Sequence, residues 1–261
     1  MTSQITVVKI GGSTLGDRDS SLDDIAALHK EGQRFVVVHG GGATISEWLD
    51  RHGVESRFVR GLRVTDERAL EVVVAVLAGL VNKRLVAELG ARGASACGLC
   101  GADVGILRAR RYDPELGFVG EIVSVNVEPL RSVAGGVVAV LAPIAVEVEG
   151  ESLRPQLLNV NADTAAGEVA AALGADRLVF LTDVPGVMDA AGAVRRRLSA
   201  ADARELLDAG TVSGGMIPKV EAGLRASEAG VPTAIIDGRE AGALRRLLAG
   251  GVEGGPGTII G

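Results

Sequence analysis

The segment from Leu157 to Met188 constrains the fold more than any other part of the sequence. It starts with an apolar, extended stretch at 157–160, continues with an alanine-rich stretch at 164–173 and Gly174, and then enters the apolar run 177–182. The alanine-rich stretch predicts a helix that ends at the glycine, and the apolar run predicts a strand covered on both faces. This order of elements predicts an α/β protein whose ligands bind beyond the carboxyl ends of parallel strands.

Polar side chains and a turn stand at the two ends of this unit. Asn159, Asn161 and Asp163 precede the predicted helix, where such side chains cap helix N-termini. Residues 183–188 follow the predicted strand as Asp-Val-Pro-Gly-Val-Met, which is typical of a turn. One candidate ligand site therefore lies at each end of the unit.

Composition excludes several classes of protein. The 261 residues suffice for one large domain or for two lobes that share a sheet, and aromatic residues make up only 2% of them, as in an α/β core packed with small aliphatic side chains. The net charge of −6 with scattered basic residues argues against nucleic-acid binding. Charges interrupt every apolar run before it could span a membrane, the N-terminus lacks a signal-peptide pattern, and two cysteines make no disulfide framework. We therefore expect a cytoplasmic protein without a membrane partner.

Two of the four lysines lie in glycine-rich segments, although the chain has 27 basic residues in total and therefore 23 arginines. Lys9 stands near the end of an apolar strand at 5–10 and just before Gly11-Gly12; such a lysine either reaches an anion or is an ordinary edge lysine. Lys219 falls in the first turn of a helix that follows Gly214-Gly215. These settings make both lysines candidates for anion binding.

A run of three glycines follows the second predicted strand, at 34–38. His39-Gly40-Gly41-Gly42 stands between this strand and a predicted helix at 43–52. We expect the glycines to adopt positive φ and to direct their N–H groups, with the helix N-terminus, at a phosphate or carboxylate. A tight turn without a ligand is the alternative, but one glycine normally suffices for it. His39 is expected to orient this loop rather than to take part in chemistry.

The stretch after the glycine run supplies a further anion-binding candidate and a predicted interface. Arg63 could capture a carboxylate through two hydrogen bonds. Residues 66–91 predict one or two helices, and the apolar side chains at 70–81 cover more than one helical stripe. Such a helix needs partners on both sides, either a second subunit or its own chain.

Two other patterns are assigned structural roles. Cys97 and Cys100 have CxxC spacing, but the alternating polarity around them favours small side chains in a strand over a metal or redox site. The Arg-rich, alternating stretch at 105–127 predicts a hairpin flap.

Neither a P-loop nor a dinucleotide-binding glycine motif is present. Two lysines, each beside a glycine-rich loop, instead favour phosphoryl transfer by positioning and charge neutralisation. The motifs of the chain resemble, in order, those of the acetylglutamate kinases, which belong to the amino acid kinase family, and the resemblance covers essentially the whole chain: Val8-Lys9-Ile10-Gly11-Gly12, His39-Gly40-Gly41-Gly42, Gly61-Leu62-Arg63-Val64-Thr65, Asn82-Lys83, Asn159-Val160-Asn161-Ala162-Asp163, Asp183-Val184-Pro185-Gly186-Val187 and Gly215-Met216-Ile217-Pro218-Lys219.

The resemblance implies a three-layer αβα sandwich around a mostly parallel central sheet. It implies an acyl-substrate and dimerisation lobe at 1–174 and an ATP-binding lobe at 175–261. The implied reaction is ATP-dependent phosphorylation of the side-chain carboxylate of N-acetyl-L-glutamate, in arginine biosynthesis. Mg²⁺ would be held mainly by the nucleotide phosphates, without protein ligands.

The resemblance also implies roles for individual residues. Lys9 and Lys219 would contact the transferred phosphoryl group, and Asp163 would hold both lysines. The substrate would be bound by Gly41, Gly42, Arg63 and Asn159. The nucleotide would be bound by Gly12, Asp183, Val184, Pro185, Gly186, Val187, Met188, Thr211, Val212 and Ser213.

Departures from the family pattern leave alternatives open. Cys100 and Val104 stand where the family is expected to have serine and glycine in a substrate-side loop. A kinase acting on carrier-protein-bound aminoadipate or glutamate, in lysine biosynthesis, is the nearest alternative. A non-catalytic nucleotide-binding regulator is another, although Lys9, Asp163 and Lys219 are all present. The chain lacks the additional N-terminal helix of hexameric, arginine-inhibited relatives, so we expect a homodimer without that feedback.

Overall fold

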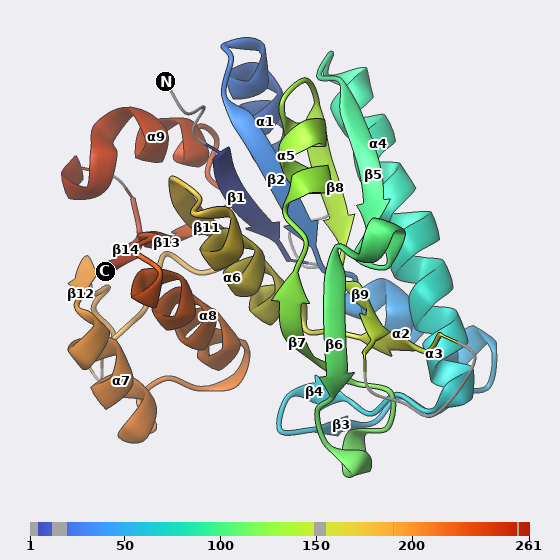
Figure 1. Ribbon diagram of the computed structural model, residues 1–261. Helices are drawn as coiled ribbons and strands as arrows, with labels where there is room; N and C mark the ends of the chain where they lie inside the picture. The colour runs from blue at the N-terminus through green and yellow to red at the C-terminus, as the bar shows by residue number, and fades with distance from the viewer. Residues whose placement is uncertain (1–4, 12–19, 149–154, 190, 255) are drawn as a thin grey trace.

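A computed structural model describes residues 5–11, 20–148, 155–189, 191–254 and 256–261, which form three layers around a central sheet (Figure 1). The eight strands follow the order β12-β14-β13-β11-β1-β2-β8-β5, and only the β13–β14 pairing is antiparallel. This confirms the predicted three-layer α/β architecture with a mostly parallel sheet. In chain order the strands of this sheet are β1 (Ile5–Ile10), β2 (Arg34–His39), β5 (Ala96–Cys100), β8 (Val138–Ala142), β11 (Arg177–Thr182), β12 (Arg197–Leu198), β13 (Thr233–Asp237) and β14 (Thr258–Ile260).

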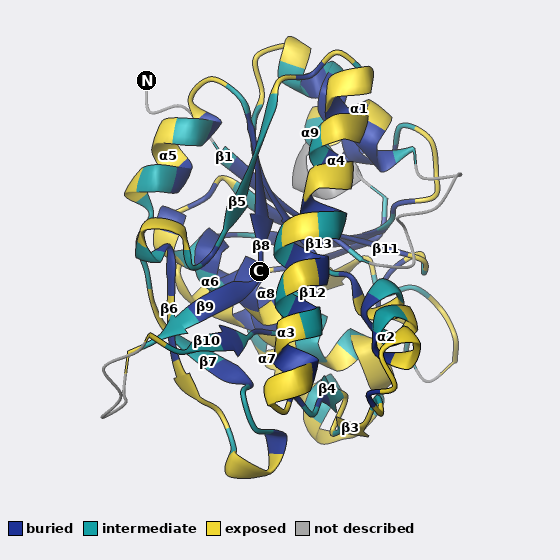
Figure 2. Cartoon of the chain, turned by 90° about the vertical axis from the view of Figure 1, so that its right-hand side faces the viewer, coloured by how far each residue is buried: buried dark blue, intermediate teal, exposed yellow. Residues whose placement is uncertain are grey.

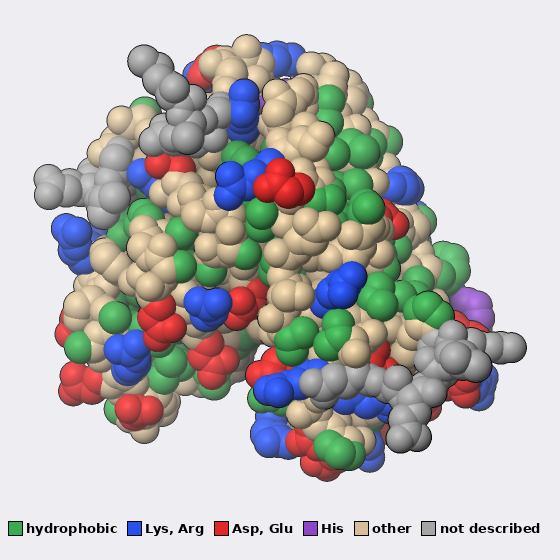
Figure 3. Space-filling view, in the orientation of Figure 1, with side chains coloured by type: hydrophobic (Ala, Val, Ile, Leu, Met, Phe, Trp, Pro, Cys, Tyr) green, Lys and Arg blue, Asp and Glu red, His purple; other side chains and the backbone are tan. Residues whose placement is uncertain are grey.

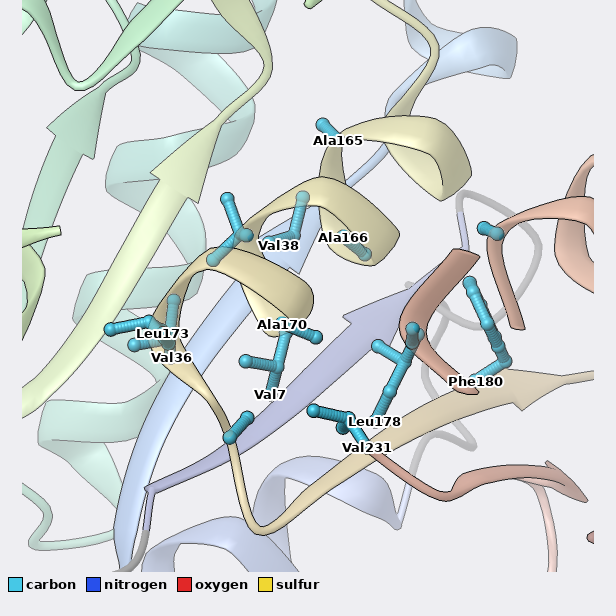
Figure 4. Close-up of a cluster of buried hydrophobic side chains, with 14 of the residues drawn as sticks. Val7, Val36, Val38, Ala165, Ala166, Ala170, Leu173, Leu178, Phe180 and Val231 are labelled. Atoms are coloured by element: carbon cyan, nitrogen blue, oxygen red, sulfur yellow. The ribbon is translucent and has the colours of Figure 1, made fainter. Parts of the chain in front are cut away.

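The central strands are apolar on both faces because helices cover both faces of the sheet. In β1, Val7 joins one buried cluster, whereas Val8 and Ile10 join the cluster on the opposite face. Figure 4 shows the first cluster, in which Val7 and Phe180 lie beneath the alanine-rich helix α6 (Ala162–Leu173). Small side chains on α6 let this helix pack closely on the sheet, in agreement with the alanine-rich composition.

The two helical layers come from different parts of the chain. One face is covered by α5 (Glu128–Ala134), α6, α7 (Ala200–Asp208) and α8 (Ile217–Glu228). The other face is covered by α1 (Ser21–Lys30), α2 (Gly42–Arg51), α3 (Glu67–Val74), α4 (Asn82–Ala91) and α9 (Ala243–Gly254).

The predicted helix at 66–91 is continuous but changes its winding. A π-helical segment, η2 (Ala75–Val81), joins α3 to α4. Figure 2 shows buried segments alternating with exposed ones along this helix. Leu70 is buried, and four further apolar side chains belong to the buried cluster on this face of the sheet: Val73, Val76, Leu77 and Val81. Burial within one chain therefore accounts for most of the wide apolar face, because the half-buried Val72 also packs against this cluster, and the half-buried Leu80 is not part of it.

A smaller four-stranded sheet flanks the central one in the order β10-β9-β6-β7. Its strands are β6 (Leu107–Arg111), β7 (Gly120–Val125), β9 (Ile144–Glu147) and β10 (Leu157–Asn159), and the antiparallel β6–β7 pair confirms the predicted hairpin. A two-stranded hairpin, β3 (Phe58–Val59) and β4 (Leu62–Arg63), lies next to this sheet in the view of Figure 1. Short 3₁₀ turns occupy Asp103–Gly105, Pro114–Leu116 and Gly214–Met216.

Two local predictions for α6 are confirmed, because Asn161 caps this helix and Gly174 closes it in the left-handed conformation. At the start of α7, Ser199 and Asp202 form a reciprocal capping box. Both cysteines are half-buried in β5. Within the described residues, no helix combines the length and the apolar character needed to cross a membrane.

Candidate active site

Asp163 joins the two glycine-flanked lysines. One carboxylate oxygen, Oδ1, lies 2.8 Å from Lys9 Nζ, and the other, Oδ2, accepts a hydrogen bond of 3.1 Å from Lys219 Nζ. Lys9 comes from the carboxyl end of β1, and Lys219 from the first turn of α8. Lys219 Nζ also donates to Gly215 O at 2.9 Å, which fixes its position relative to its own loop. The structure thus brings together the three predicted catalytic residues.

The capping prediction for this helix was only partly right. Asn161 Oδ1 accepts hydrogen bonds from the N–H groups of Asp163 and Thr164, so Asn161 alone is the cap. The carboxylate of Asp163 points instead to the lysines. Asn159 stands in β10, before the helix, and donates from Nδ2 to Thr65 Oγ1 at 3.1 Å. Capping and charge pairing are therefore divided between neighbouring side chains.

The charge centre is almost dry. Lys9 and Asp163 are each only 6% exposed. Burial lowers the pKa of Lys9 below its ordinary 10.5; the carboxylate of Asp163 opposes this effect, and the neighbouring ammonium of Lys219 adds to it. A single carboxylate between two ammonium groups leaves one positive charge uncompensated, which favours an anion in this place.

Lys9 and Asp163 lie at a cavity of about 210 Å³. The predicted substrate-binding residues Gly41, Gly42, Arg63 and Asn159 all line it. Apolar side chains contribute the rest of the wall, from Ile45, Phe58, Leu62, Leu77, Val119, Pro143 and Val160. A pocket with an apolar wall and a few polar groups is typical of a small-molecule site.

The glycine run contributes in a different way from the one predicted. Gly41 has φ of 178°, which is extended, and neither Gly40 nor Gly42 adopts positive φ. The prediction of positive φ was therefore wrong. Gly41 is needed for close approach instead, because a Cβ atom there would lie 2.8 Å from Leu77 Cδ2. The glycine lets the loop lie directly on the π-helical segment.

Arg63 is 7% exposed, and its guanidinium is already bound by protein groups. Nη2 donates to Gly42 O at 3.0 Å and to Ser46 Oγ at 2.9 Å, and Nη1 donates to Ser56 Oγ. The guanidinium also stacks on Phe58, 4.6 Å from the ring centroid. A two-point contact with a carboxylate stays a prediction, and it requires the guanidinium to exchange one of these partners.

The predicted nucleotide-binding residues lie elsewhere. Gly12 falls outside the described residues. Asp183, Pro185 and Met188 are exposed beyond the carboxyl end of β11, whereas Val187 and Val212 are buried in the apolar cluster under α8. The side chains of these two valines are therefore in the core, and their backbone N–H groups already donate to Thr258 Oγ1 and to Leu206 O.

Close packing explains the glycine in the β11 turn. Gly186 has φ of 149°, and a Cβ there would lie 2.6 Å from Thr258 Oγ1. The adjacent Pro185 lines a second cavity of about 350 Å³, whose charged lining residues include Asp237 and Arg246. Figure 3 shows a notch between two parts of the molecule. One part carries α7 and α8, and the other carries β3 and β4.

Some lining residues were not found from the sequence. Ile45 and Leu77 belong to helical apolar stripes, so the pattern indicates only core positions. Phe58 carried a usable signal, because it is one of only four phenylalanines and is close in sequence to Arg63. Pairing a rare aromatic residue with a nearby arginine could have suggested the stacking.

Comparison with known proteins identifies the family. The model of the amino acid kinase family matches residues 4–237. The chain belongs to the amino acid kinase family. Within the family, an acetylglutamate kinase of Dehalococcoides mccartyi (strain CBDB1) is 44% identical over 261 residues, covering 99% of this chain and 95% of the relative. An acetylglutamate kinase of Cereibacter sphaeroides (strain ATCC 17029 / ATH 2.4.9) is 45% identical, covering 98% and 87%. The crystal structure of a Streptococcus mutans UA159 protein superposes with a TM-score of 0.81 at 31% identity, covering 98% of each chain.

Proposed function

We propose that this protein is an acetylglutamate kinase, which transfers the γ-phosphoryl group of ATP to the side-chain carboxylate of N-acetyl-L-glutamate. The bridge from Lys9 through Asp163 to Lys219, beside a cavity lined by glycines and Arg63, carries this proposal. Two acetylglutamate kinases that are 44% and 45% identical to this chain over nearly its full length support the choice of substrate.

The arrangement addresses the main obstacle of this reaction, which is the approach of two anions. The acceptor carboxylate has a pKa of about 4.3, so it is already ionised at neutral pH and needs no general base. Lys9 and Lys219 reach the same point from opposite parts of the chain, and Asp163 keeps them together when no phosphate is bound. When the phosphoryl group arrives, two ammonium groups stabilise the charge on its oxygens. The chain therefore contributes positioning and electrostatics rather than a covalent intermediate.

Mg²⁺ would enter with the nucleotide. In the described part of the chain no group of three His, Cys, Asp or Glu side chains could hold a metal ion, and both oxygens of Asp163 face lysines. These residues fit an ion held mainly by ATP phosphates and water. The bound ion would supply further charge neutralisation on the phosphates.

The two halves of the chain would divide the work. The acyl substrate would occupy the cavity of the first lobe (1–174), and ATP would lie along the second lobe (175–261), near Asp183 to Met188 and Thr211 to Ser213. One continuous sheet supports both lobes, because β1 of the first pairs with β11 of the second. Lys9 and Lys219 would meet the phosphoryl group between the two substrates.

Assembly as a homodimer is part of this proposal. β5 is an edge strand of the central sheet, and all five of its residues are half-buried. On the helix α3-η2-α4, the half-buried Leu80 does not belong to the apolar clusters of the chain's own core. Pairing with a second copy would cover both features.

A coupled ADP-release assay tests the proposed activity. We expect turnover with ATP and free N-acetyl-L-glutamate, and much less with L-glutamate. Turnover only with a carrier-protein-bound aminoadipate or glutamate would identify the alternative kinase. Binding of ATP without turnover on any of these acceptors would identify a regulator.

A further inference from the structure

The Asn82-Lys83 pair lies directly behind the glycine run and has no role in the reaction as proposed. Asn82 is the first residue of α4 and is fully buried. From Nδ2 its side chain donates to Val140 O at 2.9 Å and lies 3.3 Å from Leu99 O. The same Nδ2 lies 3.2 Å from His39 Nε2. One amide thus connects α4, two strands of the sheet and the residue that precedes the glycines.

His39 continues this connection to the glycine loop. Its Nδ1 lies 2.9 Å from Gly40 O. Because Asn82 Nδ2 is a donor and Gly40 O is an acceptor, the imidazole must carry its proton on Nδ1 and accept at Nε2. Burial lowers the pKa of His39 to about 4, so the ring is neutral at physiological pH, as this pattern requires.

The orientation of the Gly40–Gly41 peptide follows from this contact. In a trans peptide the C=O and N–H bonds point to opposite sides. Since His39 holds Gly40 O on the inner side, the N–H of Gly41 points away from His39, and Gly41 lines the cavity. Within the described residues this N–H has no hydrogen-bond acceptor, so it is available to a bound anion.

The local structure is adapted to place Asn82. The π-helical segment η2 ends at Val81, and single π-helical turns inserted in α-helices occur often at functional sites. Lys83 Nζ donates to Asn82 Oδ1 at 3.0 Å and to Gly98 O at 3.3 Å, which orients the amide. Any side chain at position 98 would collide with that amide, so Gly98 is needed for the contact.

We propose that Asn82 is a positioning residue which, through His39, fixes the Gly40–Gly41 peptide so that the Gly41 N–H points at the acceptor carboxylate and the transferred phosphoryl group. This inference rests on the proposed kinase function. A preorganised N–H group stabilises charge that develops in the transition state, whereas a misdirected one must first reorient. Loss of Asn82 should therefore lower kcat more than it changes substrate binding.

The test uses the near-isosteric variant Asn82→Leu, with His39→Phe and the double variant. We expect Asn82→Leu to lower kcat roughly ten- to a hundredfold, below the effect of deleting a donor outright, and to leave KM for ATP within about threefold. Because Asn82 acts through His39, the double variant should be no slower than His39→Phe alone. Leu244→Ala, which removes a buried side chain on α9, is the control for lost stability: its kcat should equal that of the wild type.

Hydrogen–deuterium exchange supplies a readout that does not need activity. The N–H groups of Gly40 and Ile45 donate to Ile10 O and Gly41 O, and both should exchange faster in Asn82→Leu but not in Leu244→Ala. Unchanged kcat and unchanged exchange in a folded Asn82→Leu protein would overturn the inference, as would full additivity with His39→Phe. If the wild type does not phosphorylate N-acetyl-L-glutamate, the proposed function fails, and the exchange result alone decides whether Asn82 positions the loop.

Discussion

His39 should make the protein less stable in mild acid. The imidazole is fully buried and neutral, and Asn82 directs a donor at its Nε2. Burial lowers its pKa from 6.5 to about 4, although the hydrogen bond to Gly40 O opposes this shift. Between these two values the unfolded chain binds a proton that the folded chain does not. Stability is therefore fully present above pH 6.5 and is lost as the pH falls toward 4.

The size of the effect follows from the two pKa values. With about 4 in the folded and 6.5 in the unfolded protein, His39 lowers the free energy of unfolding by about 1.4 kcal/mol at pH 5.5 relative to pH 8. At pH 4 the loss reaches about 3 kcal/mol, because the folded protein then begins to take up the proton as well. The loss of stability at pH 5.5 is the better one to measure, because most carboxylates are still ionised at that pH.

Urea unfolding followed by the fluorescence of Trp48, the only tryptophan, measures this loss. Trp48 lies on α2, just after the glycine run. His39→Gln should show a pH dependence smaller than that of the wild type by about 1.4 kcal/mol at pH 5.5. His29→Gln, at a half-buried histidine on α1, is the matched control, and protein concentration is kept constant because subunit association adds to stability. Equal losses in the wild type and in His39→Gln would refute this account.

Four further outcomes are expected. Lys9→Ala and Lys219→Ala should each lower kcat by roughly 10²–10³ with the fold intact by circular dichroism, and near-normal turnover in either would exclude the two-lysine mechanism. Arg63→Lys should raise KM for N-acetyl-L-glutamate far more than KM for ATP, because lysine lacks the planar fork; equal rises would place Arg63 outside the substrate site. Val104→Gly should raise the free energy of unfolding by about 1 kcal/mol, because the β-branched Val104 has φ of 49°, which glycine adopts without strain. The control Val123→Gly, at a strand position without that strain, should lower the free energy of unfolding. Light scattering should give the mass of a dimer, and a monomer would show that burial within one chain is sufficient for the apolar helix.

Features that depend on near neighbours in the chain were predictable from the sequence. The strand 177–182 and the alanine-rich helix before it follow from apolar periodicity and propensity. The capping box of Ser199 and Asp202 and the left-handed Gly174 also follow, because a cap requires only residues within a few positions of the helix end. The sequence also indicated that Lys9 and Lys219 belong to the site, because lysine is scarce in this chain and both lysines lie beside glycines.

The tertiary structure alone decided how these residues act. Asp163 meets Lys9 because parallel pairing places the carboxyl end of β1 beside the start of α6, and no local pattern indicates that approach. Position 41 requires a glycine because the π-helical segment leaves no space for a Cβ atom, and not because the backbone there is left-handed. Arg63 is held by serines and a carbonyl that lie at least seven residues away. In each case a contact between distant segments determines the role, and such contacts depend on how helices pack on the sheet. The sequence by itself determined which segments form helices and strands, how the helices are capped, and which lysines are candidates for the site.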